Sequence, residues 1–578
     1  MIKIKKKENK AKKSFYFEEY RQSSENNFER KFSISHDRIY LLFFIFFSLI
    51  FIFAIKIITI SLQDPIGKYS SQGHSSFKLL RNDIMDRNGV LIARNIRVYH
   101  AAIKPELIKD KKKFILKLKI LYPSLDFKKI EKNISEKKYF YFKQNVTEDE
   151  RLKLWSLGEK GLLFETSQTR IYPHKNLFSH VVGQINLDNK GISGLEKSFD
   201  KELKSNKKEP MMTTLDINLQ FLIREELIKF QKIFKSIGSA SILMDVNSGE
   251  ILSMTSLPDF DLNKRETIDD ANYINRATKG VYEFGSVFKT FTLAGALNEG
   301  IVKTNTEFKN LPKKITCAGK PIGEYDNKIP SDLTAEQILI RSGNIGSVRI
   351  GQKVGEKRMR NFLQNIGVLS RIEFDIEEVG EPIPFRWGKC KLATASFGHG
   401  ITTTLLQLAK GYSIISNGGF NIKPTLIKRK VKESKKIRIL NKDVSKKINP
   451  ILRKIVSTKE GTANFANIEG YQVGGKTGTA HKSFNGVYSK NKINTFAAVF
   501  PTSKPQYILL VLLDEPKPSR DYIYHYKDGS GWKYKGTPYN TAGWTSVEIA
   551  GKIIEKIGPI LAINKIDFYD NHVVKKSY

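Results

Sequence analysis

The chain has 578 residues, more than one hydrophobic core supports, so two or more domains are expected. Its 40% hydrophobic and 11% aromatic content exclude an intrinsically disordered protein. The net charge of +38 raises nucleic acid as a partner, but zinc-finger spacing and aromatic-glycine RNA-binding signatures are absent from the sequence, so no nucleic-acid binding is predicted. Two cysteines, Cys317 and Cys390, are too few for a disulfide scaffold or a Cys/His metal cluster, and either one disulfide or two buried thiols fits them.

The first predicted element is a membrane anchor. Residues 39–55 are uncharged and dense in Phe, Ile and Leu, and with the apolar residues that follow they reach the length of about 20 residues that spans a bilayer. No small-x-small cleavage site follows, so residues 39–60 are expected to stay in the mature protein. Residues 1–38 are far richer in Lys and Arg than residues 57–76. This asymmetry predicts a cytoplasmic basic tail and an exported C-terminal part.

Residues 61–205 are predicted to form a non-catalytic pedestal domain. A hairpin with an Asn-Gly turn is expected over 81–93, and a Lys-rich, mixed helical pattern runs from 109 to 161. Loops and short strands are expected at 170–173, 180–183 and 191–196. The polar run 204–209 marks a domain boundary.

Residues 206–564 are predicted to form a larger domain of the α+β class. A helix is expected over 218–234, and Asn247-Ser248-Gly249 is typical of a hairpin turn. Helical patterns dominate from 286 to 365 and return from 403 to 416. Three more strands are expected at 472–480, 494–500 and 506–513. Strands at both ends with helices between them predict an antiparallel sheet packed against helices, and the polar segment 565–578 predicts a frayed C-terminal tail.

Three short segments together indicate acyl transfer by a serine nucleophile: Ser286-Val287-Phe288-Lys289, Ser342-Gly343-Asn344 and Lys476-Thr477-Gly478-Thr479. Ser286 and Lys289 are three residues apart, so they share one face of a predicted helix. A hydroxyl becomes a good nucleophile only with a base in reach, and a lysine serves as that base only when it is neutral. Burial and a second cation, Lys476, both favour the neutral amine.

The other two segments are predicted to relay protons and bind substrate. Ser342 lies between the two lysines in chain order and is expected to pass a proton to the leaving amine, while Asn344 donates to a substrate amide. The third segment is predicted to be an edge strand that binds an extended peptide and its carboxylate through Lys476, Thr477, Gly478 and Thr479. The backbone N–H groups of Ser286 and Thr479 are expected to form the oxyanion hole.

Two other motifs suggest different chemistry. Residues 470–477 satisfy the spacing of a phosphate-binding loop, but a polar stretch precedes them and a strand pattern follows, where a helix is required. His399 suggests a Ser-His pair, but a role as a turn residue is favoured because Lys289 already supplies the base.

The three motifs resemble those of class B penicillin-binding proteins, most closely the division-specific peptidoglycan transpeptidases of the FtsI type. Further matching segments are 81–93, 170–173, 191–196, 275–277, 394–400, 407–409 and 461–463. The resemblance implies one membrane helix, an elongated pedestal, and a penicillin-binding transpeptidase domain. It implies no metal and no cofactor.

The resemblance also implies the roles of individual residues. Ser286 is the acylated nucleophile and Lys289 its base. Ser342 and Asn344 form the second motif, and the carboxylate-binding strand carries Lys476, Thr477 and Thr479. Such enzymes cleave the D-Ala-D-Ala bond of a stem peptide, pass the acyl group to a neighbouring strand and are acylated by β-lactams. An inner-membrane location with a periplasmic catalytic domain is implied, as are an FtsW-type glycosyltransferase partner and other divisome proteins.

The sequence departs from the family pattern at four positions: Phe284 for Pro, Val287 for Thr, Gly343 for Ser and Asn82 for Gly. These changes are expected to affect rate and antibiotic affinity more than reaction type. An elongation transpeptidase of the penicillin-binding protein 2 type shares the catalytic motifs. Division is favoured by the 38-residue tail and the region 495–505. A membrane-bound β-lactam sensor would need a cytoplasmic signalling domain, and a β-lactamase would be shorter and lack the pedestal.

Overall fold

The computed structural model describes residues 28–62, 81–205, 209–264, 270–428, 437–484, 487–527 and 529–574. The chain divides into two units, residues 1–78 and 79–578. Most of the basic tail and part of the predicted boundary at 204–209 lie outside the described residues.

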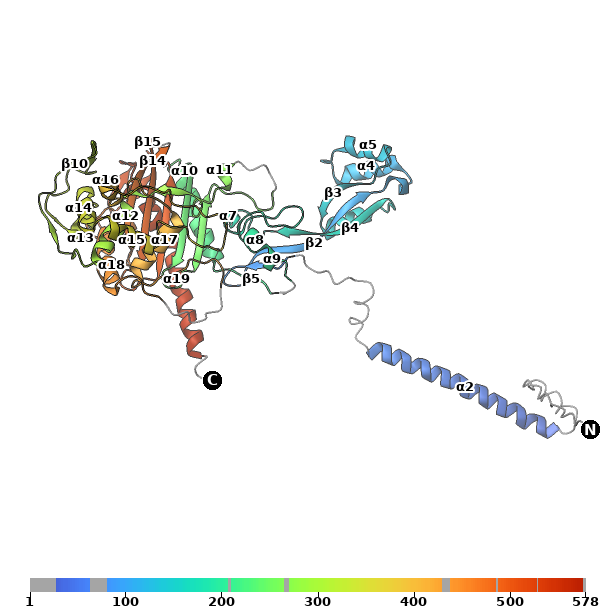
Figure 1. The fold of residues 1–578 in the computed structure, drawn as a ribbon. Coiled ribbons are helices and arrows are strands. Elements are labelled where there is room, and N and C mark those ends of the chain that lie inside the picture. The colour runs from blue at the N-terminus through green and yellow to red at the C-terminus, as the bar shows by residue number, and fades with distance from the viewer. Residues whose placement is uncertain are drawn as a thin grey trace, which may run out of the picture. The chain divides into compact units, whose positions relative to one another are not determined.

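The first unit contains one long helix, α2 (Phe28–Leu62) (Figure 1). Its stretch Tyr40–Thr59 covers 20 residues with a mean hydropathy of 2.9. A helix needs about 20 apolar residues to cross the hydrocarbon core of a bilayer. By length and composition this helix is able to cross a membrane, as the sequence predicts.

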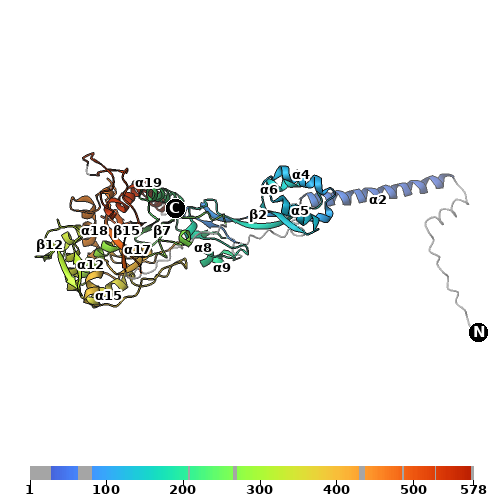
Figure 2. The same ribbon diagram turned by 90° about the horizontal axis from the view of Figure 1, so that it is seen from above.

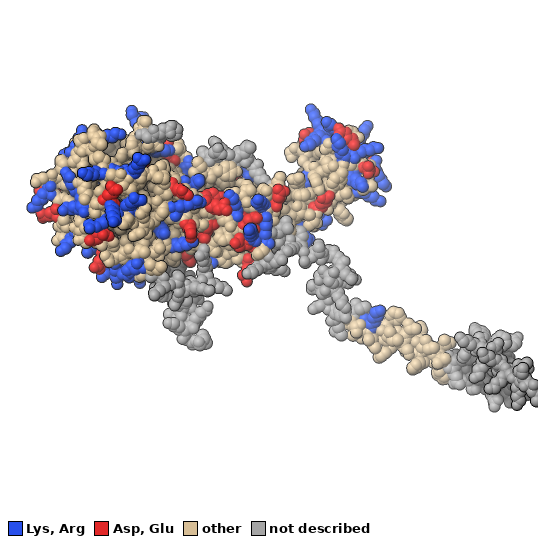
Figure 3. Space-filling model, viewed as in Figure 1, with Lys and Arg blue, Asp and Glu red and all other residues tan. Residues whose placement is uncertain are grey.

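The second unit begins with a small lobe that has its own core. β1 (Ile84–Met85) and β2 (Leu91–Ile103) pair antiparallel around the predicted Asn-Gly turn. The lobe's other elements, apart from the short η1 (Pro105–Leu107), are β3 (Phe140–Val146), β4 (Leu162–Ile171), α4 (Lys111–Leu121), α5 (Phe127–Ser135) and α6 (Glu148–Trp155). The core includes the fully buried Phe114, Leu118 and Leu154. Lys and Arg side chains crowd the outside of this lobe (Figure 3).

The segment 191–196, expected as loop and short strand, begins with a β-bridge at Gly191 and becomes helical from Gly194. It forms α8 (Gly194–Ser198), next to α7 (Ser179–Val182) and α9 (Asp200–Leu203). The backbone oxygen of Glu196 accepts a hydrogen bond from Arg81, 2.9 Å away. Among the described residues, the β-type pairing of this segment is the bridge between Ile185 and Gly191.

A five-stranded antiparallel sheet forms the centre of the larger domain, in the order β14-β15-β16-β6-β7. Its strands are β6 (Gly238–Asp245), β7 (Ile251–Leu257), β14 (Gly474–Phe484), β15 (Val487–Phe500) and β16 (Tyr507–Asp514). The predicted hairpin and all three predicted C-terminal strands are present. The pairing of β16 with β6 joins segments more than 250 residues apart in sequence and leaves β14 at one edge.

Helices cover both faces of the sheet. Figures 1 and 2 place α10 (Ile217–Ile233) and α19 (Ser546–Val574) on one side and α17 (Leu405–Ser416) with α12 (Phe288–Asn298) on the other. Further helices are α11 (Asp270–Tyr273), α13 (Ala335–Ile340), α14 (Asn344–Val354), α15 (Glu356–Asn365), α16 (Lys389–Ala395) and α18 (Lys442–Ser457). Coverage on both faces explains why β6, β7 and β16 are almost wholly buried.

The structure refines two sequence predictions of secondary structure. The stretch 286–365 contains the helices α12, α13, α14 and α15, as predicted, but short strands interrupt them: β9 (Glu307–Phe308) pairs with β12 (Leu333–Thr334), and β10 (Lys314–Cys317) forms a hairpin with β11 (Lys320–Gly323). Ala318 and Gly319 turn that hairpin with positive φ angles, which end a helical pattern. The tail 565–578 is helical as far as Val574, as the continuation of α19.

The remaining strands are short. They are β5 (Met211–Met212), β8 (Val281–Glu283), β13 (Thr402–Thr404), β17 (Ile523–His525) and β18 (Lys533–Lys535). The pair β8 and β13 matters for the site, because β8 leads directly into the segment that carries Ser286.

Candidate active site

Ser286 lies at the start of α12, in the short helical turn η2 (Gly285–Val287). Its neighbours are buried, while Ser286 itself is half-buried. Gly285 has a φ of +56°, and a Cβ there would lie 2.6 Å from the backbone oxygen of Thr479. The glycine therefore allows the turn to approach β14 closely. The Tyr412 hydroxyl donates to the Val287 oxygen over 2.8 Å and fixes the turn from the other side.

The side chain of Lys289 is buried and points at the second motif. Its Nζ donates to Asn344 Oδ1 over 2.6 Å, lies 3.3 Å from Ser342 Oγ, and also donates to the Ser342 backbone oxygen. Ser342 has a φ of +58°, a left-handed conformation that turns its carbonyl and hydroxyl toward the same amine. Within the described residues, the hydrogen bonds of Lys289 go to the second motif and none goes to Ser286.

Lys476 reaches the same hydroxyl from β14. Its Nζ donates to Ser342 Oγ over 2.8 Å and to the Thr477 backbone oxygen over 3.0 Å. Ser342 therefore lies between two buried lysine amines, the arrangement that the sequence predicts for a proton relay.

Two buried lysines at one hydroxyl cannot both keep ordinary pKa values. Burial lowers the pKa of Lys289 to about 7, against an opposing contribution from the Glu324 carboxylate. Burial and the charge of Lys289 hold the pKa of Lys476 well below its ordinary value. A neutral amine is thus accessible near neutral pH, which is the condition for a lysine to act as a base.

The predicted substrate strand is the edge strand β14. A Cβ at Gly478 would lie 2.1 Å from the Phe284 backbone oxygen, so the strand touches the turn that carries Ser286. The hydroxyls of Thr477 and Thr462 are 2.7 Å apart, and Thr479 Oγ1 accepts a hydrogen bond from the Ala542 backbone over 2.9 Å. Both threonine side chains are therefore oriented by segments outside β14.

The residues that depart from the family pattern beside Ser286 are used for packing. Phe284 and Val287 are fully buried, and Val287 Cγ2 would lie 2.4 Å from a Cβ at Gly478. A Cβ at Gly343 would have its nearest neighbour 3.7 Å away, which is ordinary contact. Crowding therefore does not explain the glycine in the second motif.

Three features of the site escape the sequence analysis. Glu324, after β11, accepts hydrogen bonds from the first backbone N–H groups of α14. Thr462 lies in the matching segment 461–463, but its contact with Thr477 is seen only in the structure. Cys317 and Cys390 form a disulfide, which resolves the pairing that the sequence leaves open. The only sequence signal for the contact of Glu324 with α14 is the polar character of Gly323-Glu324-Tyr325 within a stretch of helical pattern.

His399 lies in the turn 398–400 beside the site. Its ring stacks on Tyr488 with centroids 4.6 Å apart, and its Nδ1 is 3.9 Å from a Glu283 carboxylate oxygen. Burial lowers its pKa in spite of that carboxylate. Among the described residues its ring contacts Phe397, Tyr488 and Glu283 and not Ser286, and it lies in the turn that the sequence favours.

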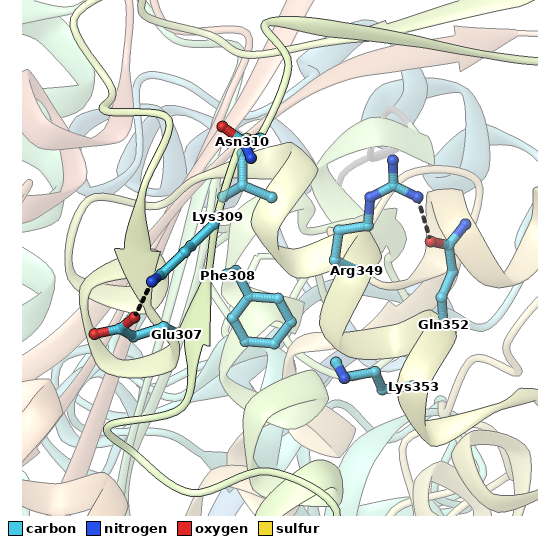
Figure 4. A pocket seen from close by; sticks show the side chains of 8 residues that line it. Glu307, Phe308, Lys309, Asn310, Arg349, Gln352 and Lys353 are labelled. Carbon is cyan, nitrogen blue, oxygen red and sulfur yellow. Dashed lines mark hydrogen bonds and ion pairs between the residues drawn. The ribbon is translucent and has the colours of Figure 1, made fainter.

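A separate pocket lies between β9 and α14 (Figure 4). Its lining comprises Glu307, Phe308, Lys309, Asn310, Leu311, Arg349, Gln352 and Lys353. It contains none of the three motifs. Within the described ranges, no group of three or more His, Cys, Asp or Glu side chains is placed to hold a metal ion.

Comparisons with known proteins agree with the fold and the motifs. Residues 239–530 match the penicillin binding protein transpeptidase domain, and residues 79–218 match the penicillin-binding protein dimerisation domain. The chain therefore belongs to the penicillin-binding protein transpeptidase family, as a class B member of the FtsI type. It is a peptidoglycan D,D-transpeptidase that acts at D-Ala-D-Ala.

The similarity to individual relatives extends over most of the chain. The probable peptidoglycan D,D-transpeptidase FtsI of Caulobacter vibrioides is 29% identical over 84% of this chain and 82% of its own length. Stage V sporulation protein D of Bacillus subtilis is 28% identical over 78% and 77%. The crystal structure of a peptidoglycan synthetase from Bifidobacterium adolescentis matches with a TM-score of 0.63 at 20% identity, over 84% of this chain and 96% of that one, which shows a shared fold.

Proposed function

We propose that the transpeptidase reaction proceeds through an acyl-enzyme on Ser286. Neutral Lys289 takes the proton of the Ser286 hydroxyl as its oxygen attacks the carbonyl carbon of the penultimate D-Ala. The tetrahedral intermediate collapses, the peptide bond breaks, and the terminal D-Ala amine leaves with a proton. An amine of a second stem peptide then attacks the ester, which restores Ser286 and forms the cross-link. Two buried amines on Ser342 Oγ, 3.3 and 2.8 Å away, are the observation that carries this proposal.

The proposed proton path runs through Ser342. Its hydroxyl contacts both lysine amines, so a proton that Lys289 receives can reach the leaving amine without crossing solvent. Asn344 is assigned to the substrate amide. Its Nδ2 already donates to the Gly323 oxygen over 2.7 Å, and an amide nitrogen has two N–H groups, so the second one serves the substrate.

Substrate binding is assigned to the edge of β14. An extended stem peptide adds its backbone to an unpaired strand edge, and Lys476, Thr477 and Thr479 hold its terminal carboxylate. The N–H groups of Ser286 and Thr479 complete the oxyanion hole, where loss of one donor costs about 10² to 10³ in rate.

Fluorescent penicillin tests these assignments on the full-length protein in detergent. Wild-type protein is expected to form a stable covalent adduct, and Ser286→Ala is expected to form none, by gel and by intact mass. An adduct on the Ser286→Ala protein would place the nucleophile elsewhere.

We assign the enzyme to septal wall synthesis during division. The Caulobacter relative is named FtsI, and the basic tail fits the division type. The sporulation protein is similar to nearly the same degree, so the assignment needs a cellular test. A fluorescent fusion is expected at midcell, and depletion is expected to give filaments. A side-wall pattern would instead favour the elongation type.

We further propose that the N-terminus is cytoplasmic and the catalytic domain periplasmic. The excess of Lys and Arg before Tyr40–Thr59 supports this orientation, and the Cys317–Cys390 disulfide fits an oxidising compartment. Protease added to spheroplasts is expected to digest the catalytic domain. An FtsW-type glycosyltransferase is the proposed membrane partner, and cross-linkers placed along Tyr40–Thr59 should capture it.

A further inference from the structure

Glu324 is an acidic residue that none of the three motifs contains, yet it contacts the second motif directly. Its Oε2 accepts the Asn344 backbone N–H over 2.6 Å, and its Oε1 accepts the Ile345 N–H over 2.9 Å. The first N–H groups of a helix lack partners within that helix, and its N-terminus favours a negative charge. The carboxylate therefore fixes the first turn of α14 at both oxygens.

The same loop also holds the Asn344 side chain. Asn344 Nδ2 donates to the Gly323 oxygen over 2.7 Å, which turns Oδ1 toward Lys289 Nζ, 2.6 Å away. Backbone and side chain of Asn344 are thus both held by residues 323–324. A short chain of contacts leads from Glu324 through Asn344 to the base.

Glu324 also supplies the negative charge of this region. The ionisable groups that face Lys289 are Lys476, on β14, and Glu324, which flanks Tyr325 and Asp326 on the loop after β11. Burial disfavours the ammonium form of Lys289, whereas the Glu324 carboxylate favours it; the charge of Lys289 in turn lowers the pKa of Lys476. The protonation of the base is therefore set by burial and by Glu324, which oppose each other.

The hairpin before Glu324 is covalently tethered. Cys317, at the end of β10, is bonded to Cys390 on α16, and β11 ends at Gly323. The turn of this hairpin is exposed. The disulfide therefore limits the motion of the loop that brings Glu324 to α14.

We propose that Glu324 is a positioning residue of the transpeptidase site, whose carboxylate orients Asn344 against Lys289 and serves as a counter-charge for the base. This inference rests on the proposed roles of Ser286 and Lys289. Two substitutions separate its two parts. Glu324→Gln keeps the length of the side chain and removes the charge, whereas Glu324→Asp keeps the charge and shortens the side chain.

The test is the pH dependence of the second-order acylation rate with fluorescent penicillin, on full-length protein in detergent. For Glu324→Gln the midpoint of the rising limb is expected to move to lower pH, because the ammonium form of Lys289 loses its counter-charge. For Glu324→Asp the midpoint is expected to stay, while the plateau rate falls by about 10- to 100-fold, because small displacements of a positioning group cost that much. Asp326→Asn is the matched control, since Asp326 lies on the same loop and its side chain accepts a local hydrogen bond from the Lys328 backbone N–H.

The outcomes distinguish this inference from the proposal on which it rests. Equal midpoints for wild-type and Glu324→Gln proteins would overturn the charge role, even if both plateaus fell. An unchanged plateau in Glu324→Asp would overturn the positioning role. Wild-type protein without Ser286-dependent acylation would remove the basis of both proposals. Melting curves of each variant confirm that the compared proteins are folded.

Discussion

Two regions of this molecule bury charged side chains, and they do so in opposite ways. Where β4 meets α8 and α9, a region here called the pedestal root, Arg81 and Arg170 both contact Glu196, at 2.7 Å each. Arg81 also contacts Asp200 at 2.5 Å. In the active site, Lys289 and Lys476 share one hydroxyl. The first cluster pairs opposite charges, and the second places like charges together.

The difference shows what each region is for. Burial alone would raise the pKa of the Asp200 carboxyl, but hydrogen bonds from Arg81, Gly191 and Lys204 lower it to about 2, so the charged form is retained. In the active site, burial moves the lysines toward their neutral forms. The pedestal root uses its charges to hold segments together. The active site accepts a cost in stability to obtain a reactive base.

Replacement of the base is expected to have the largest effect. Lys289→Met should reduce acylation by about 10² to 10⁴, the usual contribution of a general base. It should also stabilise the protein, because lowering the pKa of Lys289 from 10.5 to about 7 costs about 4 to 5 kcal/mol. The pKa of Lys289 is lower in the folded state than in the unfolded state. The free energy of unfolding of the wild-type protein should therefore rise from pH 7 toward pH 10. The Lys289→Met protein should lack the part of this rise that Lys289 contributes. If Lys289→Met lowers both the acylation rate and the free energy of unfolding at every pH, the buried lysine does not cost stability. The contrast drawn between the active site and the pedestal root would then be wrong.

The converse experiment removes one partner from the cluster of opposite charges at the pedestal root. Glu196→Ala leaves Arg81 and Arg170 buried without their shared partner and is expected to cost about 3 to 5 kcal/mol in unfolding free energy. Denaturant titration measures this loss, and Glu202→Ala, an exposed acid on α9, is the control. Equal denaturation midpoints for Glu196→Ala and Glu202→Ala would show that the charge cluster does not stabilise the pedestal root.

Removal of the disulfide tests how the active-site region is held. The bond closes a loop with a sequence separation of 73, and such bonds typically contribute about 2 to 4 kcal/mol. Dithiothreitol should lower the melting temperature of the wild-type protein and leave Cys317→Ser/Cys390→Ser unchanged. A wild-type melting curve that does not respond to reductant would argue against this role.

The smallest effect is expected at His399. Its ring contributes stacking on Tyr488 and Phe397, and such contacts are worth about 0.5 to 1.5 kcal/mol. His399→Ala should therefore slow acylation by less than about tenfold. A loss of three orders of magnitude would instead identify His399 as the base in place of Lys289.

The three motifs can be found in the sequence because each is short and contiguous. Ser286 and Lys289 are one helical turn apart, and Lys476 to Thr479 occupy successive positions of one strand, so local patterns find them. The hairpin of β6 and β7 and the membrane-length helix are also recognised from local signals. The three predicted C-terminal strands are present for the same reason.

Contacts between distant segments could not be predicted in this way. Glu324 reaches Asn344 through a hairpin that interrupts a stretch with helical character, and no spacing rule connects the two. The pairing of Cys317 with Cys390 depends on where β10 and α16 meet. Local polarity likewise suggests fraying after residue 564, whereas α19 continues to Val574.

The most direct measurement is the pH dependence of the acylation rate of wild-type protein, with Ser286→Ala as the blank. A rising limb with its midpoint near 7, the pKa to which burial lowers Lys289, is expected. A rate that keeps rising until about pH 10, the ordinary range of a lysine amine, would contradict a buried, neutral base beside Ser286.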